Sequence, residues 1–288
     1  TPDLAYLLKA SGCIAIAGGL EVASDRLLKL MKKGVTVEKV AQVANSLTQA
    51  GIMVHAYLMY GFPTETEQET IDALEMVRQL FENEVIQSGF WHQFAMTSHS
   101  PVGLNPSAYE VVKLGPKFEG FADNDLYHDD PKGAEHAIFS EGLKTSLFNY
   151  MNGLGLDENL ALWFKFKIPK TTIPKDFILK SLKPKAEGYR HNISVVWIGN
   201  TPEMISMDNN EMSVLEFYSK SNSFALDLDP TLAIWLLHVL ESCTFQQSDR
   251  LTFEAFKVSY RDEIHDDFDT FWQSETIEIL RSNGLLVL

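Results

Sequence analysis

The chain has 288 residues, of which 45% are hydrophobic, so it is long enough to bury a large core in one or two domains. Its formal net charge of −15 argues against non-specific nucleic-acid binding, which depends on clustered Lys and Arg side chains. The two cysteines, Cys13 and Cys243, are too few for a disulfide framework or a Cys-rich metal site, and we expect both to be buried thiols.

Targeting signals do not stand out in the sequence. No uninterrupted apolar stretch reaches the roughly 18 residues of a membrane span, and the start shows no signal-peptide pattern. We therefore expect a soluble, cytoplasmic protein with neither membrane nor DNA as a partner. The chain opens at Thr1-Pro2, without an initiator methionine, directly into the helical pattern "LAYLLKASG", which suggests a piece of a longer protein.

The first hundred residues alternate between strand and helix patterns. Residues 13–19, "CIAIAGG", form an apolar run that ends in glycines, as a strand covered on both faces does. Ser24 and Asp25 are N-cap residue types, and the helical pattern that follows them stops at Gly34. A second helical pattern covers residues 36–51.

The alternation continues with two more strands. Residues 52–63, "IMVHAYLMYGFP", indicate a second buried strand closed by glycine and proline. Thr64 to Glu67 fits a capping box that precedes the helical pattern "IDALEMVRQLF". Residues 89–101, "GFWHQFAMTSHSP", predict a third strand. Alternating strands and helices favour a parallel sheet, so the fold class of this part is α/β.

Polar residues follow the strands at one predicted edge. In parallel sheets, ligands gather outside the carboxyl ends of the strands, where helix N-termini offer free N–H groups. We therefore expect Glu21, the Gly61–Pro63 turn and the Ser98–Pro101 segment to converge. His99 lies in the last segment and could face a substrate, although a single loop histidine is more often solvated or structural.

Beyond Pro106 the alternation stops. Residues 107–130 predict a long irregular segment. Its acidic end lacks the glycine and glutamate of an EF-hand calcium loop. A helix is predicted around 136–151, and residues 161–168 fit either a helix or a strand. Antiparallel strands are then predicted at 191–199, 203–207 and 214–228, and helices at 229–243, 252–264 and 274–288, the last ending in a strand. This α+β end fits a winged helix, although its acidic balance argues against DNA binding.

Three blocks, "GGLEVASDRLLKLMKKGVTVEKV", "LTQAGIMVHAYLMYGFPTETEQETIDAL" and "FAMTSHSPVGLNP", together resemble the second half of a radical S-adenosylmethionine barrel. The closest group is the subset associated with a cobalamin-binding domain, and the resemblance covers about residues 4–106. It implies half of a six-stranded partial TIM barrel, with the fourth, fifth and sixth strands present. The predicted organisation is a half-barrel at 1–106, a mainly helical connection at 107–192 and an α+β auxiliary region at 193–288.

The resemblance also implies a binding site for S-adenosylmethionine. Glu21 matches the position that binds the ribose, and Lys33 matches the basic position that pairs with the carboxylate. A carboxylate accepts from vicinal hydroxyls and an ammonium pairs with a carboxylate, so the residue types suit these roles. Ser24 lies at the same helix start. The spacing alone favours a capping role for Glu21 and Ser24, whereas the resemblance favours a role in ligand binding.

Gly61, Phe62 and Pro63 match the turn that flanks the adenine in this family. Without the resemblance, Gly-Phe-Pro is an ordinary end to a strand, and a structural role is equally compatible with the sequence. Some relatives carry an acidic residue where this chain has Tyr57.

The cluster-binding CxxxCxxC motif of the family is absent from this chain. The resemblance therefore implies a C-terminal fragment of an enzyme that cleaves S-adenosylmethionine to a 5'-deoxyadenosyl radical with a 4Fe-4S cluster, and in which cobalamin is a further candidate cofactor. We expect no metal or cofactor bound to this chain by itself. The alternative is a cluster-free interaction or regulatory module. Expected partners are the missing N-terminal half, an unidentified substrate, and a second copy through the free edge of the first strand.

Overall fold

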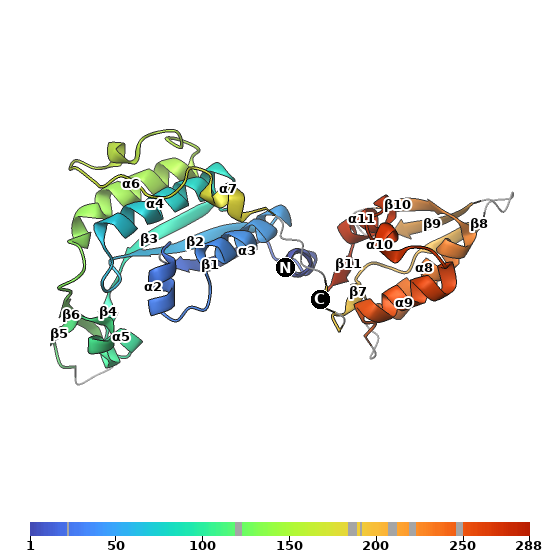
Figure 1. Cartoon of the computed structure of the whole chain (residues 1–288), viewed down its shortest axis with the longest axis horizontal. Helices are drawn as coiled ribbons and strands as arrows, with labels where there is room; N and C mark the ends of the chain where they lie inside the picture. The colour runs from blue at the N-terminus through green and yellow to red at the C-terminus, as the bar shows by residue number, and fades with distance from the viewer. Residues whose placement is uncertain are drawn as a thin grey trace. The chain divides into compact units, whose positions relative to one another are not determined.

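The computed structural model forms two compact units, drawn in Figure 1, each of which is described by itself. The first unit contains residues 12–184. The second contains residues 3–11, which make up most of helix α1 (Pro2–Ala10), together with residues 185–288. The structure describes residues 1–21, 23–118, 123–183, 189–190, 192–206, 212–218, 223–245 and 250–288.

The first unit is built on a sheet of three parallel strands. These are β1 (Ala15–Glu21), β2 (Met53–Tyr60) and β3 (Ser88–Gln93), in the order β1-β2-β3. Both strand pairs are parallel, as predicted. All three strands therefore end at the same edge of the sheet, which is the edge where the sequence places its polar residues.

Helices α2 (Asp25–Leu30), α3 (Val37–Gln49) and α4 (Glu67–Glu82) connect the strands. Each begins after a Ser or Thr whose hydroxyl accepts a hydrogen bond from a backbone N–H of the first turn. The core of the unit joins apolar side chains of α3 and α4 to alternate residues of β2, among them Val54, Ala56 and Leu58. Figure 1 shows α4 running alongside the strands.

The prediction that β1 and β2 are buried on both faces is wrong. Burial alternates along β2, so that Val54 and Ala56 are buried while Met53 and Tyr57 are 56% and 47% exposed. Side chains of successive strand residues point to opposite faces, and the described helices of the unit pack their apolar side chains against one of these faces. The apolar run of β2 therefore includes apolar side chains on the exposed face. A strand that is buried on one face could carry polar residues at these positions.

Two other details differ from the prediction. The capping box lies at Thr66 and Glu69, because Thr64 adopts a positive φ of 68° that an N-cap residue does not use. The predicted third strand divides into β3 and the short β4 (Met96–Thr97). The latter leaves the parallel sheet and pairs antiparallel with β6 (Asp125–Asp129).

Residues 101–183 stay with the first unit and are not mainly helical. Their elements are α5 (Pro101–Leu104), the 3-10 turn η1 (Pro106–Tyr109), β5 (Val112–Gly115), β6, η2 (His136–Phe139), α6 (Ser140–Met151), η3 (Leu160–Trp163) and α7 (Phe177–Ser181). Strands β4, β6 and β5 form a small antiparallel sheet, and α6 packs against β3 and α4. The predicted boundaries at 106 and 192 thus differ from the division at 184.

The second unit is an α+β body. Its strands are β7 (Val195–Trp197), β8 (Glu203–Ser206), β9 (Ser213–Tyr218), β10 (Ser223–Leu228) and β11 (Leu285–Val287), and its helices after α1 are α8 (Pro230–Ser242), α9 (Phe253–Ile264), α10 (Phe268–Trp272) and α11 (Glu275–Ser282). The sheets β10-β9-β8 and β11-β7 are antiparallel, as predicted. Its core packs Trp235, Phe256 and Phe268 together. The winged-helix assignment stays a prediction.

Within the part of the chain that the structure describes, no helix is both long and apolar enough to span a bilayer.

Candidate functional site

The carboxyl end of β1 holds the first pair of predicted site residues. Lys33 Nζ lies 2.8 Å from Glu21 Oε1, and the two side chains are 43% and 22% exposed. The register with β2 shifts between Gly19 and Glu21, and Glu21 has a φ of 53°. Its carboxylate folds back over Gly19, where a side chain would collide with it. The structure therefore brings Glu21 and Lys33 together as a partly exposed ion pair.

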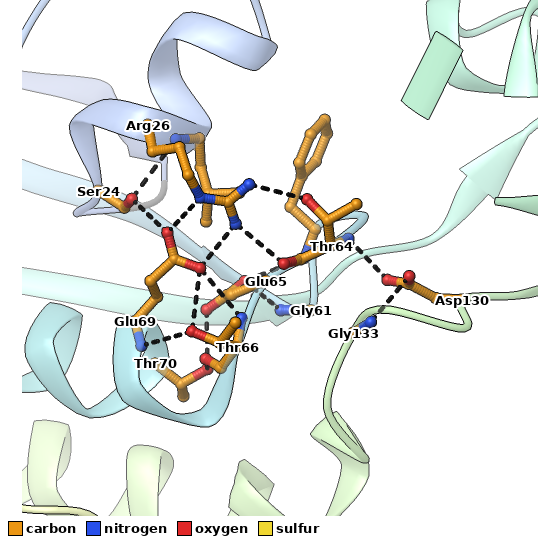
Figure 2. A network of polar contacts seen from close by, with 12 residues as sticks. Ser24, Arg26, Gly61, Thr64, Glu65, Thr66, Glu69, Thr70, Asp130 and Gly133 are labelled. Carbon is orange, nitrogen blue, oxygen red and sulfur yellow. Dashed lines mark hydrogen bonds and ion pairs between the residues drawn. The ribbon is translucent and has the colours of Figure 1, made fainter. Parts of the chain in front are cut away.

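Arg26 links the start of α2 to the turn between β2 and α4. Its guanidinium donates to both carboxylate oxygens of Glu69, from Nε to Oε1 and from Nη2 to Oε2, each at 2.7 Å. It also donates to the Thr64 hydroxyl at 3.0 Å and to the Thr64 carbonyl at 2.9 Å. Figure 2 shows the guanidinium lying between the two residues. A bidentate pair of this kind fixes geometry as well as charge.

Ser24 and Glu69 complete this link. The Ser24 hydroxyl donates to Glu69 Oε1 at 3.0 Å and accepts from the N–H of Leu27, so it caps α2 while contacting α4. Burial on its own would raise the pKa of Glu69, but hydrogen bonds from Arg26 and Thr66 and the charge of Arg26 outweigh that effect and lower the pKa. Glu69 is therefore a carboxylate that joins the start of α2 to the start of α4.

Glu65 supports the turn from inside. The residue is 1% exposed, and its Oε2 accepts from the backbone N–H groups of Gly61 at 2.7 Å and Phe62 at 3.0 Å. Its Oε1 accepts from the Thr70 hydroxyl at 2.8 Å. Desolvation by burial outweighs these hydrogen bonds and raises the pKa of Glu65 to about 7. Burial therefore favours the protonated form of Glu65 over its carboxylate.

The predicted turn residues Gly61, Phe62 and Pro63 are all buried. Gly61 has a φ of 79°, a conformation that suits glycine. The Phe62 ring is 5% exposed and packs edge-to-face against Phe94 and Tyr109, with centroid separations of 5.2 and 6.0 Å. The turn is therefore packed on its outer side, and Phe62 offers no open ring surface in this structure.

Asp130, which directly follows β6, holds the turn after β2 in place. Its Oδ2 accepts from the Thr64 N–H at 2.8 Å, and its Oδ1 accepts from the Gly133 N–H at 2.9 Å. Figure 2 shows the Asp130 loop reaching the turn from the side opposite Arg26. The Ala134 N–H donates to the Glu65 carbonyl at 3.0 Å.

The open face of the sheet carries a group of rings. Tyr57 stacks on His92 with centroids 5.9 Å apart, and His92 lies 4.4 Å from Phe90. The His55 ring meets Tyr57 edge-on at 5.3 Å, and its Nδ1 is 2.8 Å from the Ser88 hydroxyl. These rings lie on the same sheet that ends at Glu21 and Gly61, so the open face continues from the candidate site.

The residues predicted to form the binding site lie in two places in the structure. Glu21 and Lys33 meet at the end of β1, while Gly61, Phe62 and Pro63 lie in the buried turn after β2. Ser24 bonds Glu69 in the first turn of α4, the helix that follows this turn. His99 is exposed in the loop before α5, whose N-terminus is capped by the hydroxyl of Ser100.

Sequence reasoning missed Arg26, Glu65, Glu69 and Asp130. The capping-box spacing of Thr66 and Glu69 could have identified Glu69. Nothing in the sequence distinguishes the buried Glu65 from its neighbours Glu67 and Glu69, since the three alternate along "TETEQE". Arg26 bonds Thr64 and Glu69, and Asp130 bonds Thr64, across more than 35 residues of sequence, so these contacts depend on the fold.

The cysteines of this chain do not fit an iron-sulfur cluster. Cys13 belongs to the first compact unit and is half-buried, whereas Cys243 belongs to the second and is buried. Burial raises the pKa of the Cys243 thiol to about 12, which disfavours the thiolate that binds metal. Among the described residues, no three His, Cys, Asp or Glu side chains gather as a metal site. A four-iron cluster usually has about four thiolate ligands.

Two comparisons with known proteins bear on this site. Residues 1–77 match the family model described as the radical SAM superfamily. An uncharacterized methyltransferase from Pyrococcus horikoshii is 27% identical over 77 residues, which are 27% of this chain and 17% of that protein. The chain thus covers about a sixth of the length of this relative. The matched residues include β1, β2 and most of α4, so the segment that carries the candidate site is similar to the radical SAM superfamily.

Proposed function

We propose that this chain is the C-terminal part of a radical S-adenosylmethionine enzyme and supplies the strands that hold the nucleoside end of the cofactor. The match of residues 1–77 to the radical SAM superfamily supports this proposal. The ordered sequence blocks suggest the cobalamin-associated subset. Reductive cleavage of S-adenosylmethionine is then an activity of the whole protein, because this chain lacks a ligand set for the cluster. The auxiliary region would cover a substrate whose identity is open.

Glu21 and Lys33 are the residues that we propose to bind the cofactor. The carboxylate would accept hydrogen bonds from the ribose hydroxyls, and the ammonium would pair with the carboxylate of the methionine moiety. Their contact at 2.8 Å places acceptor and cation side by side at the end of β1. Gly61, Phe62 and Pro63 would border the adenine through backbone atoms, because the Phe62 ring is already packed against Phe94 and Tyr109.

Anaerobic assays of the full-length protein test this function. We expect reduced protein to form 5'-deoxyadenosine from S-adenosylmethionine, with KM for the cofactor raised at least tenfold in Glu21→Ala and in Lys33→Ala. The exposed Glu67 at the start of α4 provides the control variant Glu67→Ala, which should leave KM unchanged. Cleavage with an unchanged KM in both site variants would overturn the assigned roles, and no cleavage at all would overturn the function.

The free side of β1 suggests where the rest of the protein docks. Among the described residues, β1 forms its strand pair with β2. A cavity of about 280 Å³ lies beside it, lined by apolar side chains that include Ile16, Leu20, Val40, Leu47 and Val54. We propose that a preceding strand and helix of the same protein fill this place, since the matched relative is much longer than the matched segment.

Light scattering of the 288-residue chain at increasing concentration tests this docking. Self-association that is lost in Ile16→Lys would show that the β1 edge is available to a partner. A monomer at all concentrations, whose β1 amides exchange as slowly as those of β2, would contradict it.

A cluster-free interaction module is the second candidate. Two observations favour it: Glu21 and Lys33 satisfy one another, and residues 61–65 are buried by the chain itself. The coding sequence upstream of Thr1 distinguishes the two functions. A CxxxCxxC motif roughly a hundred residues before Thr1 supports the enzyme, and a start codon near Thr1 supports the module.

A further inference from the structure

The turn proposed to border the adenine is covered by a segment of the same unit. Every residue from Gly61 to Glu65 is buried, although the sheet below the turn has one open face. The three atoms nearest to a side chain added at Gly61 all belong to the His136 side chain, at 3.1 to 3.3 Å. Residues 130–136, here called the strap, therefore lie directly against the backbone of the turn.

Two hydrogen bonds join the strap to the turn, and a Lys132–Glu110 ion pair joins it to the end of η1. Asp130 accepts from the Thr64 N–H at 2.8 Å, and the Ala134 N–H donates to the Glu65 carbonyl at 3.0 Å. Gly133 allows the strap to fold around the Asp130 carboxylate, because a side chain at this position would collide with it. The strap thus bonds the turn at two positions, Asp130 and Ala134.

The buried side chain of His136 destabilises the closed position of the strap. The residue is 8% exposed, and neither Nδ1 nor Nε2 has a hydrogen-bond partner in the part of the chain that the structure describes. Burial lowers the pKa of its imidazole, although the nearby Asp130 charge partly opposes this shift. A buried polar group without a partner favours any state in which water or a ligand can reach it.

We propose that residues 130–136 form a strap that closes over the Gly61–Glu65 turn and lifts, independently of the sheet, to admit a nucleoside. The nucleoside part rests on the proposed function. In the lifted state water or the nucleoside reaches the imidazole nitrogens of His136, and the side of the turn that His136 covers becomes accessible. Asp130 is the residue that holds the strap closed.

Amide hydrogen exchange of the 288-residue chain, resolved by NMR, tests the strap. Asp130→Ala should speed exchange of the Gly61, Phe62 and Ala134 amides at least tenfold, although none of them bonds Asp130. Amides in the middle of β2 should be unaffected. His136→Leu should slow the same three amides at least threefold, because it keeps apolar volume and removes both unpartnered nitrogens. Asp129→Ala changes an exposed neighbour and is the control.

Opposite effects of the two variants would support the strap. Equal exchange rates of the three amides in Asp130→Ala and the native chain, or faster exchange throughout residues 12–184, would overturn it.

Adenosine is the binding probe: its Kd should fall at least fivefold in Asp130→Ala and rise in His136→Leu. Weaker adenosine binding in Asp130→Ala would show that the segment is a fixed wall and overturn its gating role. Adenosine binding to no variant, together with the expected exchange pattern, would count against the proposed function and support the strap.

Discussion

The ends of β1 and β2 lie at the same edge of one sheet, yet they are built in opposite ways. At β1, Glu21 and Lys33 form a single ion pair that solvent reaches on both side chains. At β2, residues 61–65 are buried, and Glu65 and Asp130 accept hydrogen bonds from their backbone N–H groups. At the β1 end, a ligand can therefore replace the contact between Glu21 and Lys33 at a small cost in free energy. At the β2 end, protein acceptors already hold the backbone N–H groups in place.

The largest expected effect comes from removing the buried carboxyl group of the turn. Glu65→Ala leaves the N–H groups of Gly61 and Phe62 buried without an acceptor and should reduce the free energy of unfolding by about 4 kcal/mol. Glu65→Gln retains an acceptor oxygen and a donor toward Thr70, so its loss should stay below about 1 kcal/mol. Urea unfolding measures both, and equal losses would contradict the role of the hydrogen bonds.

The pH dependence of stability tests the same group. Its folded pKa of about 7 lies above the ordinary value of 4.5, so the folded chain holds this proton more tightly than the unfolded chain does. The contribution of Glu65 is complete below pH 4.5 and is lost as the pH rises toward 7, by at most about 3 kcal/mol. Subtracting the Glu65→Gln curve from the native curve between pH 4.5 and 8 should isolate this slope, and parallel curves would argue against it.

Gly61 offers a smaller effect. An alanine there meets both a positive φ and the His136 ring, and we expect a loss of about 2 kcal/mol in the free energy of unfolding. Gly34 is the matched control, because its φ is 70° but no atom lies within 4 Å of an added side chain. Gly34→Ala should cost about 1 kcal/mol. Thermal unfolding of both variants separates crowding from backbone strain, and identical losses would remove the crowding argument.

The smallest effect is expected at the β1 end. Lys33→Ala removes a partly exposed ion pair and should change the free energy of unfolding by about 0.5 kcal/mol or less, and less again at high salt. A loss as large as that of Glu65→Ala in the same urea titration would mean that the two ends are not built differently.

The same contrast explains how far the sequence predicted this region. Glycine after a strand and Ser or Thr before a helix are local signals, so the strands and helices could be placed from the sequence, whereas Glu21 and Lys33 were singled out as ligand-binding residues through the family resemblance. The burial of Glu65 and the approach of Asp130 arise from contacts between segments, which local patterns do not encode. The open face of β2 was missed because its apolar residues resemble those of a strand covered on both sides.

Titration calorimetry of S-adenosylmethionine into the 288-residue chain tests the central claim most directly. The claim is that this chain holds the nucleoside end of the cofactor while its main anchor lies elsewhere in the protein. Exposed contacts of Glu21 and Lys33 contribute on the order of 1 kcal/mol each, too little to immobilise a flexible ligand. We therefore predict that the Kd for S-adenosylmethionine is about 1 mM or weaker. Micromolar binding that is abolished by Glu21→Ala would contradict the account, because the chain would then be a complete site by itself.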